Sequence, residues 1–498
     1  MKFILAIDQG TTSTRAIAFD EHFVAKAVSQ MELTQHYPQP GWVEHDAEEI
    51  WRATLQTCRE VIDKIGGPGA VQCIGITNQR ETTILWDRAT GAAIHRAIVW
   101  QDRRTAETCD HLRKLGREPD IQEKTGLLLD PYFSGTKIAW TLDHVEGARG
   151  RAQTGDLAFG TVDSFLIWRL TSGRTHATDV TNASRTLLFG LEPPEWRDDL
   201  CAMLGVPRAV LPEARPSAGL FGETDPSLFG RAIPITGVAG DQQAALVGHG
   251  CLAPGRAKAT YGTGCFLVMN AGAHPARSKN RLLGTIGYQT QSEIAYALEG
   301  SIFSAGATIQ WLRDGLKVIG AARESEALAA SLQDNGGVYL VPAFAGLGAP
   351  QWAADARGAI VGLTRDSSAA HLVRAGLEAV AYQTRDLLDA LKADGAPAPE
   401  ALLVDGGLTA NDWAMQFLAD VCEAPVERPA YQEMTALGAA KLAALGAGLV
   451  SDLASMEDLS PRARWEPRMA AAERTRLLEG WRAAVAGALA ARSRGSLA

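Results

Sequence analysis

Apolar runs of strand length alternate with polar turns and with amphipathic segments along most of this chain. Residues 3–7 are apolar, residues 8–13 are small or polar, and residues 15–19 lead back into an apolar run. Short apolar runs bounded by turn residues are typical of buried strands, so the pattern predicts a hairpin over residues 3–19. Its tip would carry Asp8, Thr11, Thr12, Ser13 and Arg15. Exposed backbone N–H groups in such a turn suit a phosphate, although most hairpin turns bind nothing.

Helical periodicity predicts helices with one buried face. Apolar residues between 50 and 65 recur at helical spacing, and Asp46 with Glu49 has the spacing of a capping box. A second amphipathic helix is predicted over residues 368–392. Residues 464–498 are rich in Ala and Arg and are also expected to be helical.

Three other apolar runs, 71–76, 234–240 and 401–405, each end in polar or glycine-rich residues. The ends of buried strands commonly carry ligand-binding loops, which makes the following residues candidates for a site. Arg80 and Trp100 lie in or near such loops. A structural ion pair for Arg80 and a core position for Trp100 remain open alternatives.

The remaining segments have weaker patterns. Residues 158–190 suggest short strands separated by polar turns, and the Pro- and Gly-rich residues 191–233 suggest an irregular connection. Residues 300–315 are expected to be helical, and residues 337–344 to form a buried strand.

The pattern of the N-terminal hairpin recurs in the second half of the chain. Residues 258–272 read as a strand, a Gly-Thr-Gly turn and a second strand, which loosely repeats residues 3–19 without the aspartate. We therefore expect two related domains, residues 1–248 and 249–498. The length of 498 residues agrees, since single hydrophobic cores stop growing well below that size.

Composition excludes several classes of protein. The formal net charge of −9 argues against nucleic-acid binding, which rests on basic surface. There is neither an apolar run of membrane-spanning length nor an N-terminal leader pattern, so we expect a cytoplasmic protein without stable membrane insertion. The 7 cysteines are scattered and the 10 histidines never fall at ligand spacing, which favours reduced thiols and no metal site made of protein nitrogen.

Candidate chemistry follows from the glycine turn at residues 405–407, where a predicted strand leads into a helix near Asn411. Glycines let the backbone approach a ligand, and a helix N-terminus favours anions. Neither a Walker A pattern nor G-x-G-x-x-G occurs, so P-loop and Rossmann sites lose support. Two domains with these turns facing a cleft are the arrangement of actin-like ATPases and sugar kinases.

Collinear segments over nearly the whole chain resemble the FGGY carbohydrate kinase family. They are DQGTTSTRA at 8, PGWVEHD at 40, GITNQRETT at 75, IVWQDRR at 98, DPYFSGTK at 130, TNASRTLLF at 181, GDQQAAL at 240, TYGTGCF at 260, GATIQWLRD at 306, VPAFAGLGAP at 341 and VDGGLTAN at 404. PGWVEHD and NQRETT together resemble the glycerol-phosphorylating branch. The resemblance implies an α/β fold of two ribonuclease H-like (actin-like ATPase) domains with a ligand cleft between them.

The activity implied by the resemblance is transfer of the γ-phosphoryl group of ATP to glycerol, which gives sn-glycerol 3-phosphate in the first step of glycerol catabolism. ATP would be the co-substrate, Mg²⁺ the cofactor, and a homodimer or homotetramer the usual assembly. A kinase for another sugar or polyol, and an actin-like nucleotide-sensing ATPase, are the two alternatives. Some relatives are inhibited through a Gly- and Lys-rich loop or activated through a phosphorylated histidine. Residues 216–233 contain neither lysine nor histidine, so neither control is expected.

The resemblance also implies residue roles. Asp241 matches the catalytic base. Arg80, Glu81, Tyr132, Asp241 and Gln242 match polar glycerol ligands, and Trp100 and Phe266 match the aromatics on its carbon chain. The positions that match the ATP site are Thr11, Thr12, Ser13, Arg15, Thr263, Gly306, Gln310, Gly407 and Asn411. Asp8 matches a magnesium position, contacted through water.

Overall fold

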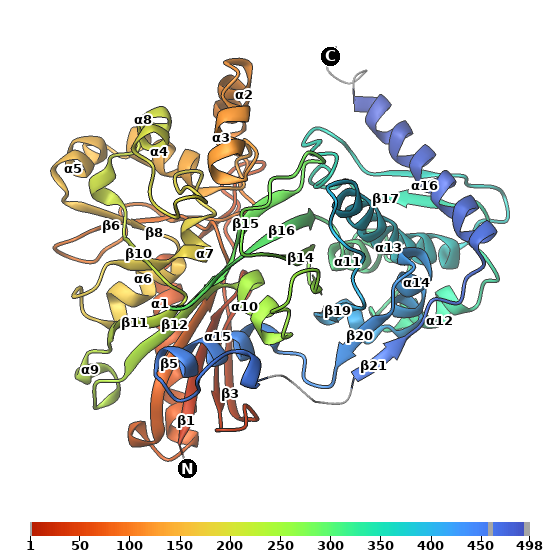
Figure 1. The fold of residues 1–498 in the computed structure, drawn as a ribbon. Coiled ribbons are helices and arrows are strands. Elements are labelled where there is room, and N and C mark those ends of the chain that lie inside the picture. Colours follow the sequence, from red (N-terminus) through yellow and green to blue (C-terminus); the bar gives the residue numbers. More distant parts are fainter. Residues whose placement is uncertain (1, 457–461, 493–498) are drawn as a thin grey trace.

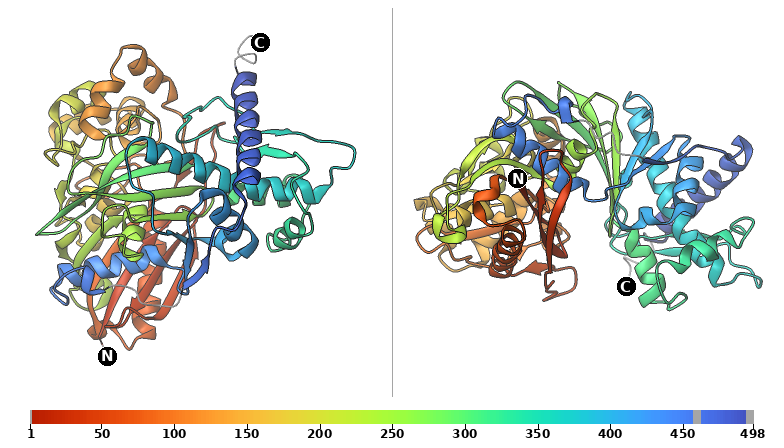
Figure 2. Two further views of the ribbon diagram at one scale, coloured as in Figure 1. Left: turned by 45° about the vertical axis from the view of Figure 1, so that its right-hand side comes forward. Right: turned by 90° about the horizontal axis from the view of Figure 1, so that it is seen from below.

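The computed structural model of the protein describes residues 2–456 and 462–492. Two large sheets lie side by side, each covered by helices, and the long strands β15 and β16 of the second sheet lie toward the first lobe (Figure 1). The other views show the two lobes from the side and from below (Figure 2). This is a mixed α/β architecture, as expected.

The first sheet has six strands in the order β11-β12-β5-β1-β2-β3. They are β1 Phe3–Gln9, β2 Ser13–Phe19, β3 Ala25–Glu32, β5 Val71–Asn78, β11 Ala218–Glu223 and β12 Pro234–Gly240. β1 and β2 form the predicted hairpin, with Asp8 opposite Arg15. β1 runs parallel to β5, and β5 runs parallel to β12. Because the carboxyl ends of parallel strands meet at one edge, Asp8 and Asp241 are brought to the same edge of the sheet.

The second sheet has seven strands in the order β15-β16-β14-β13-β19-β20-β21. They are β13 Ala257–Tyr261, β14 Cys265–Gly272, β15 Leu283–Gln289, β16 Ile294–Ile302, β19 Leu402–Asp405, β20 Val426–Pro429 and β21 Arg462–Trp465. β13 pairs antiparallel with β14 and parallel with β19, as β1 does with β2 and β5. The repeat predicted from the two hairpins is therefore confirmed, while the domain boundary at residue 248 stays a prediction.

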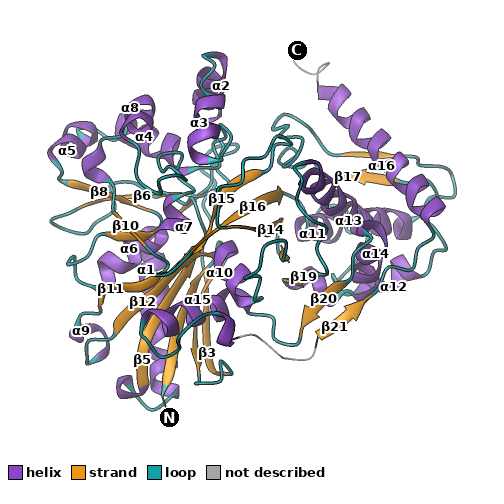
Figure 3. Cartoon of the chain, in the orientation of Figure 1, coloured by secondary structure: helices purple, strands orange, loops and turns teal. Residues whose placement is uncertain are grey.

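Helices cover both faces of the first sheet (Figure 3). α1 Ala47–Lys64 and α6 Val162–Leu170 bury their apolar residues in one cluster with Leu5, Ile7 and Ile74. α10 Asp241–Gly248 and α15 Met434–Gly446 form a cluster with residues of the opposite face. α15 follows β20 in the chain, so a helix from the second half completes the core of the first sheet (Figure 1).

The second sheet is covered by the helices that follow its strands in the chain. α13 Ala369–Ala393, α14 Asp412–Cys422 and α16 Ala471–Arg492 share one large apolar cluster with β13, β14 and β19. α11 Gly306–Asp314 and α12 Glu324–Ala330 pack against α13. The helix predicted over residues 368–392 is thus confirmed. The helix predicted over residues 464–498 is confirmed only for Ala471–Arg492, because residues 464–465 belong to β21 and residues 466–470 are not helical. Residues 493–498 lie outside the described part of the chain.

Smaller elements complete the fold. The short strands form pairs: β4 Glu44–His45 with β7 Ala97–Ile98, β6 Ile84–Asp87 with β8 Leu157–Gly160, β9 Ala177–Asp179 with β10 Glu213–Arg215, and β17 Tyr339–Val341 with β18 Ala359–Val361. The short helices are α2 Ala106–Lys114, α3 Glu118–Thr125, α4 Ser134–His144, α5 Ala148–Thr154, α7 Val180–Ala183, α8 Asp198–Leu204 and α9 Pro226–Phe229. The 3₁₀ turns are η1 Pro68–Ala70, η2 Arg208–Val210, η3 Gly407–Ala410 and η4 Ala454–Met456.

Two predicted segments were wrong in part, although β8 and β9 are short strands as expected for residues 158–190. The segment 158–190 contains α6, which the sequence hides because its residues are buried on nearly every side and show no apolar stripe. The segment 191–233 is not irregular throughout, since it supplies α8 and the edge strand β11.

Two other expectations hold only in part. Residues 300–302 belong to β16, and the helix predicted from residue 300 begins at Gly306. Asp46 caps α1 as predicted, accepting a hydrogen bond from the Glu48 backbone N–H. Glu49 does not complete a capping box, because its carboxylate accepts two 3.0 Å hydrogen bonds from Thr34.

The crossing of α15 over α10 depends on a glycine without room for a side chain. A Cβ added at Gly438 would lie 1.8 Å from the Ala244 carbonyl oxygen, which is backbone and cannot rotate away. We expect Gly438→Ala to lower the free energy of unfolding by about 1–3 kcal/mol, the usual range for overpacking. Thermal and urea unfolding measure this. Gly487→Ala in α16 is the control, because no atom lies within 4 Å of its added Cβ, and equal stability of the two variants would contradict the prediction.

Candidate active site

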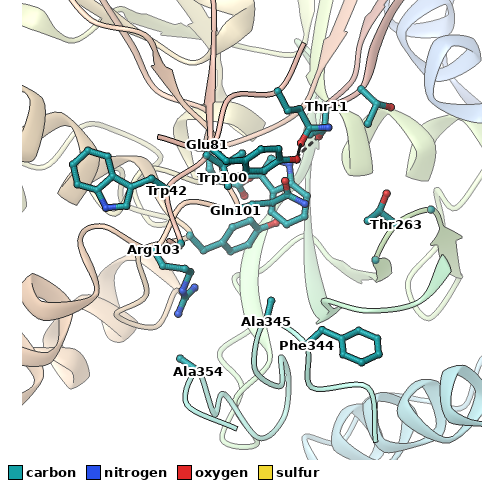
Figure 4. A pocket seen from close by; sticks show the side chains of 18 of the residues that line it. Thr11, Trp42, Glu81, Trp100, Gln101, Arg103, Thr263, Phe344, Ala345 and Ala354 are labelled. Carbon is teal, nitrogen blue, oxygen red and sulfur yellow. Dashed lines mark hydrogen bonds between the residues drawn. The ribbon is translucent and has the colours of Figure 1, made fainter. Parts of the chain in front are cut away.

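A cavity of about 1520 Å³ lies between residues of the two halves of the chain (Figure 4). Its lining includes every residue predicted to bind glycerol: Arg80, Glu81, Trp100, Tyr132, Asp241, Gln242 and Phe266. Thr11 and Thr12 of the β1–β2 turn line the same cavity. The structure therefore brings together residues as far apart in the sequence as Thr11 and Phe266.

A second cavity, of about 500 Å³, adjoins the first, because Gly262, Thr263 and Gln310 line both. Five residues predicted at the ATP site line this second cavity: Thr263, Gly306, Gln310, Gly407 and Asn411. The Asn411 side chain also accepts a 2.8 Å hydrogen bond from the Ala414 backbone N–H, which caps α14. The two predicted sites are thus parts of one continuous cleft.

Three predicted residues line neither cavity. Ser13 and Asp8 are absent from both linings, and Arg15 lines a third cavity of about 820 Å³ that shares Gly407 with the second. The Arg15 guanidinium pairs there with the Glu433 carboxylate and donates a 2.7 Å hydrogen bond to Gln30. Arg15 therefore lies beside the second cavity and does not line the first.

Asp8 lies in an electrostatically unfavourable place for a carboxylate. Burial raises its pKa to about 7, and the charges of Glu433, Asp241 and Asp405 act in the same direction, while Arg15 opposes them. A cation beside Asp8 would relieve this, and carboxylate oxygens are ligands that Mg²⁺ accepts. The described residues contain no group of three or more His, Cys, Asp or Glu side chains arranged to hold a metal.

Asp241 is presented by a strand end and a helix start, since β12 ends at Gly240 and α10 begins at Asp241. Its Oδ1 lies 3.3 Å from the Nε of Arg80. Burial raises the pKa of Asp241, and the nearby charges of Arg80 and Lys258 oppose the rise. A Cβ at residue 240 would lie 2.6 Å from Cγ of Arg80, so a glycine there permits this close approach.

The loop after β5 is held in a strained conformation. Glu81 has a positive φ of 58°, which is uncommon for a residue with a side chain and marks a constrained site. The buried ammonium group of Lys137 donates hydrogen bonds to the carbonyl oxygens of Glu81, at 3.1 Å, and Tyr132, at 2.8 Å. Lys137 thereby fixes the backbone of two residues that line the first cavity.

Three neighbouring aromatic rings line the first cavity. The Trp100 ring meets Tyr132 and Phe266 edge to face, with centroids 5.7 Å apart in each pair. Its Nε1 donates a 2.9 Å hydrogen bond to Oγ1 of Thr11. The Trp100 ring is half-buried, because it lines the cleft on one side and packs against a buried apolar cluster on the other. Arg80 fulfils both alternatives, since it lines the cavity and also forms buried ion pairs.

Sequence reasoning missed several charged and polar residues behind the cavity wall: Arg185, Gln243, Lys258 and Glu299. Lys258 donates hydrogen bonds to the Gln242 side chain and, at 2.9 Å, to Thr260. Lys258 in β13 and Glu299 in β16 could have been found from the sequence, because each is a single charged residue in an otherwise mostly apolar strand. A charge that is buried in this way needs a partner.

Other expectations concern the whole chain. All 7 cysteines are buried and free, which confirms the prediction of reduced thiols. Among the helices of residues 2–456 and 462–492, none combines the length and apolar character needed to cross a membrane.

Comparisons with known proteins agree with this geometry. Residues 3–248 match the N-terminal domain, and residues 257–447 the C-terminal domain, of the FGGY family of carbohydrate kinases. The chain is 59% identical to the glycerol kinase of Rhodospirillum centenum over 484 residues, covering 97% of each chain. It is 55% identical to glycerol kinase 1 of Pseudomonas aeruginosa over 488 residues, covering 97% of this chain and 98% of that one.

Solved structures resemble the whole molecule. The crystal structure of Plasmodium falciparum glycerol kinase with ADP is 37% identical and covers 98% of both chains with a TM-score of 0.90. Xylulose kinase from Lactobacillus acidophilus, at 22% identity and with full coverage of both chains, has a TM-score of 0.89 and shares the fold. Because both family domains match in order and relatives align along nearly the full length, the chain belongs to the FGGY family of carbohydrate kinases.

Proposed function

We propose that the protein transfers the γ-phosphoryl group of ATP to a terminal hydroxyl of glycerol, giving sn-glycerol 3-phosphate. The observation that carries the proposal is the continuous cleft. In it, a cavity lined by aromatic and charged side chains meets a smaller cavity that is lined partly by glycines. Relatives of 55–59% identity over nearly the full chain are glycerol kinases, which supports the same substrate.

The glycerol cavity has the two surfaces that a short polyol requires. The carbon chain would lie against Trp100 and Phe266, whose edge-to-face contact narrows the space. The hydroxyl groups would bond to Arg80, Glu81, Tyr132, Asp241 and Gln242, all of which line the cavity. A buried polar pocket of this kind discriminates strongly, because a ligand without the matching hydroxyl leaves these groups unpaired.

The nucleotide would occupy the second cavity, which is lined by the predicted ATP residues Thr263, Gly306, Gln310, Gly407 and Asn411. Thr11, Thr12 and Ser13 of the β1–β2 turn would face the transferred phosphoryl group, and Arg15 would neutralise its charge. Asp8 would hold Mg²⁺ through water, and the ion would neutralise charge on the phosphates. The raised pKa of Asp8 supports this assignment.

Asp241 would act as the general base. It would accept the proton of the attacking hydroxyl as the oxygen–phosphorus bond forms and the bond to the ADP leaving group breaks. Arg80 lies 3.3 Å from Asp241 and would keep the carboxylate ionised and oriented. Phosphoryl transfer requires little covalent work from a protein, so positioning and charge neutralisation would supply most of the rate.

The pH dependence of the reaction should report on Asp241. A base must be ionised to act, and burial raises the pKa of Asp241 above 3.8. We therefore expect kcat/KM for glycerol to fall as the pH decreases, with an apparent pKa above 3.8. Initial rates between pH 4 and 8 at a fixed excess of Mg²⁺ and ATP measure it, and a flat profile down to pH 4 would contradict the assignment.

One assay separates the proposed function from its alternatives. ADP release is measured with glycerol, ribulose, xylulose or no acceptor. We expect release with glycerol alone. Release with a pentulose would indicate another FGGY kinase, and equal release without any acceptor would indicate a nucleotide-sensing ATPase.

We further propose a cytoplasmic homodimer or homotetramer that performs the first step of glycerol catabolism. Sedimentation equilibrium measures the assembly.

A further inference from the structure

Four charged side chains form a closed ring behind the glycerol cavity: Arg80, Glu81, Arg185 and Glu299. Each has at most 2% of its surface exposed. The two terminal nitrogens of Arg80 donate hydrogen bonds to the two oxygens of Glu299. Arg185 donates to Glu299 Oε1 at 2.8 Å and to Glu81 Oε1 at 2.6 Å. The ring closes where Nε of Arg80 lies 3.8 Å from Glu81 Oε1.

The ring joins three separate parts of the chain. Arg80 and Glu81 lie in the loop after β5, Arg185 follows α7, and Glu299 lies in β16 of the second sheet. Only Arg80 and Glu81 line the cavity, so Arg185 and Glu299 touch no ligand there. Burial by itself would raise the pKa of Glu299, but Arg185 and Arg80 hold it at about 2. Glu299 is therefore a fixed negative charge.

Glu299 determines which way Arg80 faces. With both terminal nitrogens of Arg80 engaged by Glu299, its Nε remains directed at Asp241, 3.3 Å away. Without this carboxylate, the terminal nitrogens of Arg80 would keep only neutral acceptors, Oε1 of Gln243 at 3.2 Å and the Tyr132 hydroxyl at 3.1 Å. The remaining carboxylates beside the guanidinium would be Asp241 and Glu81, both proposed glycerol ligands. The guanidinium would then bind the groups that should receive the glycerol hydroxyls.

We propose that Arg185 and Glu299 are positioning residues for glycerol, which hold Arg80 and Glu81 in the binding geometry, and that the second sheet thereby completes the acceptor site of the first. This inference rests on the proposed function. The bidentate pair between Arg80 and Glu299 fixes the orientation of Arg80, because two parallel hydrogen bonds define the plane of its guanidinium.

The test compares Glu299→Gln with the unmodified protein. Glutamine preserves the shape but removes the charge, and we expect KM for glycerol to rise roughly 10- to 100-fold while KM for ATP changes by less than about 3-fold. Arg185→Lys should also raise KM for glycerol, because lysine keeps the positive charge but lacks the planar guanidinium that donates to two carboxylates at once. In the double variant, KM for glycerol should rise about as much as in the more impaired single variant, because the four side chains of the ring act together.

A matched control lies in α13. Glu378 is fully buried and accepts hydrogen bonds from Arg374 at 2.7 Å and Tyr382 at 2.9 Å, but it does not line the cleft cavities. Glu378→Gln should lower the melting temperature and leave both KM values unchanged. A merely structural role for Glu299 predicts the same result for Glu299→Gln.

The outcomes distinguish this inference from the proposed function. If the unmodified protein releases no ADP with glycerol, the function fails and the inference with it. If it is active and Glu299→Gln leaves KM for glycerol within about 3-fold, or raises both KM values together, only the inference is overturned. If Glu299→Gln does not fold, Arg185→Lys decides by the same criterion.

Discussion

Asp241→Asn is expected to lower kcat by roughly 10²- to 10⁴-fold, the usual contribution of a general base, while KM for glycerol changes much less. Asparagine keeps the size of the side chain and its contact with Arg80, but it cannot accept the hydroxyl proton. The carboxylate stands at the start of α10 with Arg80 3.3 Å away, and it lines the cavity that holds the other predicted glycerol ligands.

The control for this variant is Asp386→Asn. Asp386 is also a half-buried carboxylate. Its Oδ2 accepts a 2.8 Å hydrogen bond from Nε1 of Trp481, and burial raises its pKa to about 6. It lies in α13, away from the cleft, so kcat should remain within about 2-fold of the unmodified value. Steady-state kinetics at saturating ATP measure both variants. Near-normal turnover of Asp241→Asn would remove the base assignment.

Gly406→Ala is expected to weaken ADP binding by roughly 100-fold, because the turn between β19 and η3 would have to move. Gly406 has a φ of 93°, and an added Cβ would lie 2.5 Å from the Tyr261 carbonyl oxygen. Its neighbour Gly407 lines the nucleotide cavity. If the turn reaches its binding geometry in only a small fraction of molecules, the apparent affinity falls by that fraction. Isothermal titration with ADP measures it.

Gly395→Ala separates the two effects of a side chain at residue 406, which are the conformational cost of a positive φ and the steric clash of the added Cβ. Gly395 has a similar φ of 87°, but nothing lies within 4 Å of its added Cβ. Its substitution carries the conformational cost of positive φ, about 1 kcal/mol of stability, without a steric clash. ADP affinity should remain within about 2-fold. Equal ADP affinity in the two variants would show that the turn at Gly406 does not shape the nucleotide site.

Elements with a clear local signal were predicted well. The hairpin of β1 and β2, its repeat in β13 and β14, and the capped helices α1, α13 and α14 all follow from apolar periodicity and turn residues. α6 was missed, because a helix that is buried on nearly all sides loses its periodicity. Tertiary burial decided that segment.

The residues of the candidate site also include some that the sequence revealed and others that only the folded structure revealed. The family resemblance supplied the predicted glycerol and ATP residues, and the structure brings the glycerol set and most of the ATP set into one cleft. Arg15 was expected at the phosphates, and it pairs with Glu433, a residue distant in sequence that no local pattern connects to it. Glu299 was missed for the same reason, since its partners Arg80 and Arg185 lie in other segments.

The sequence by itself determined the local elements, the repeated strand–turn–strand units and the chemical types at each strand end. These depend on neighbours within a few positions, where backbone geometry and hydrophobic periodicity act. Only the tertiary structure decided that α15 covers the first sheet and that Glu299 of the second sheet orients Arg80 of the first. A buried charge requires a partner, but its identity depends on which distant segments meet, because burial and pairing are properties of the packed molecule.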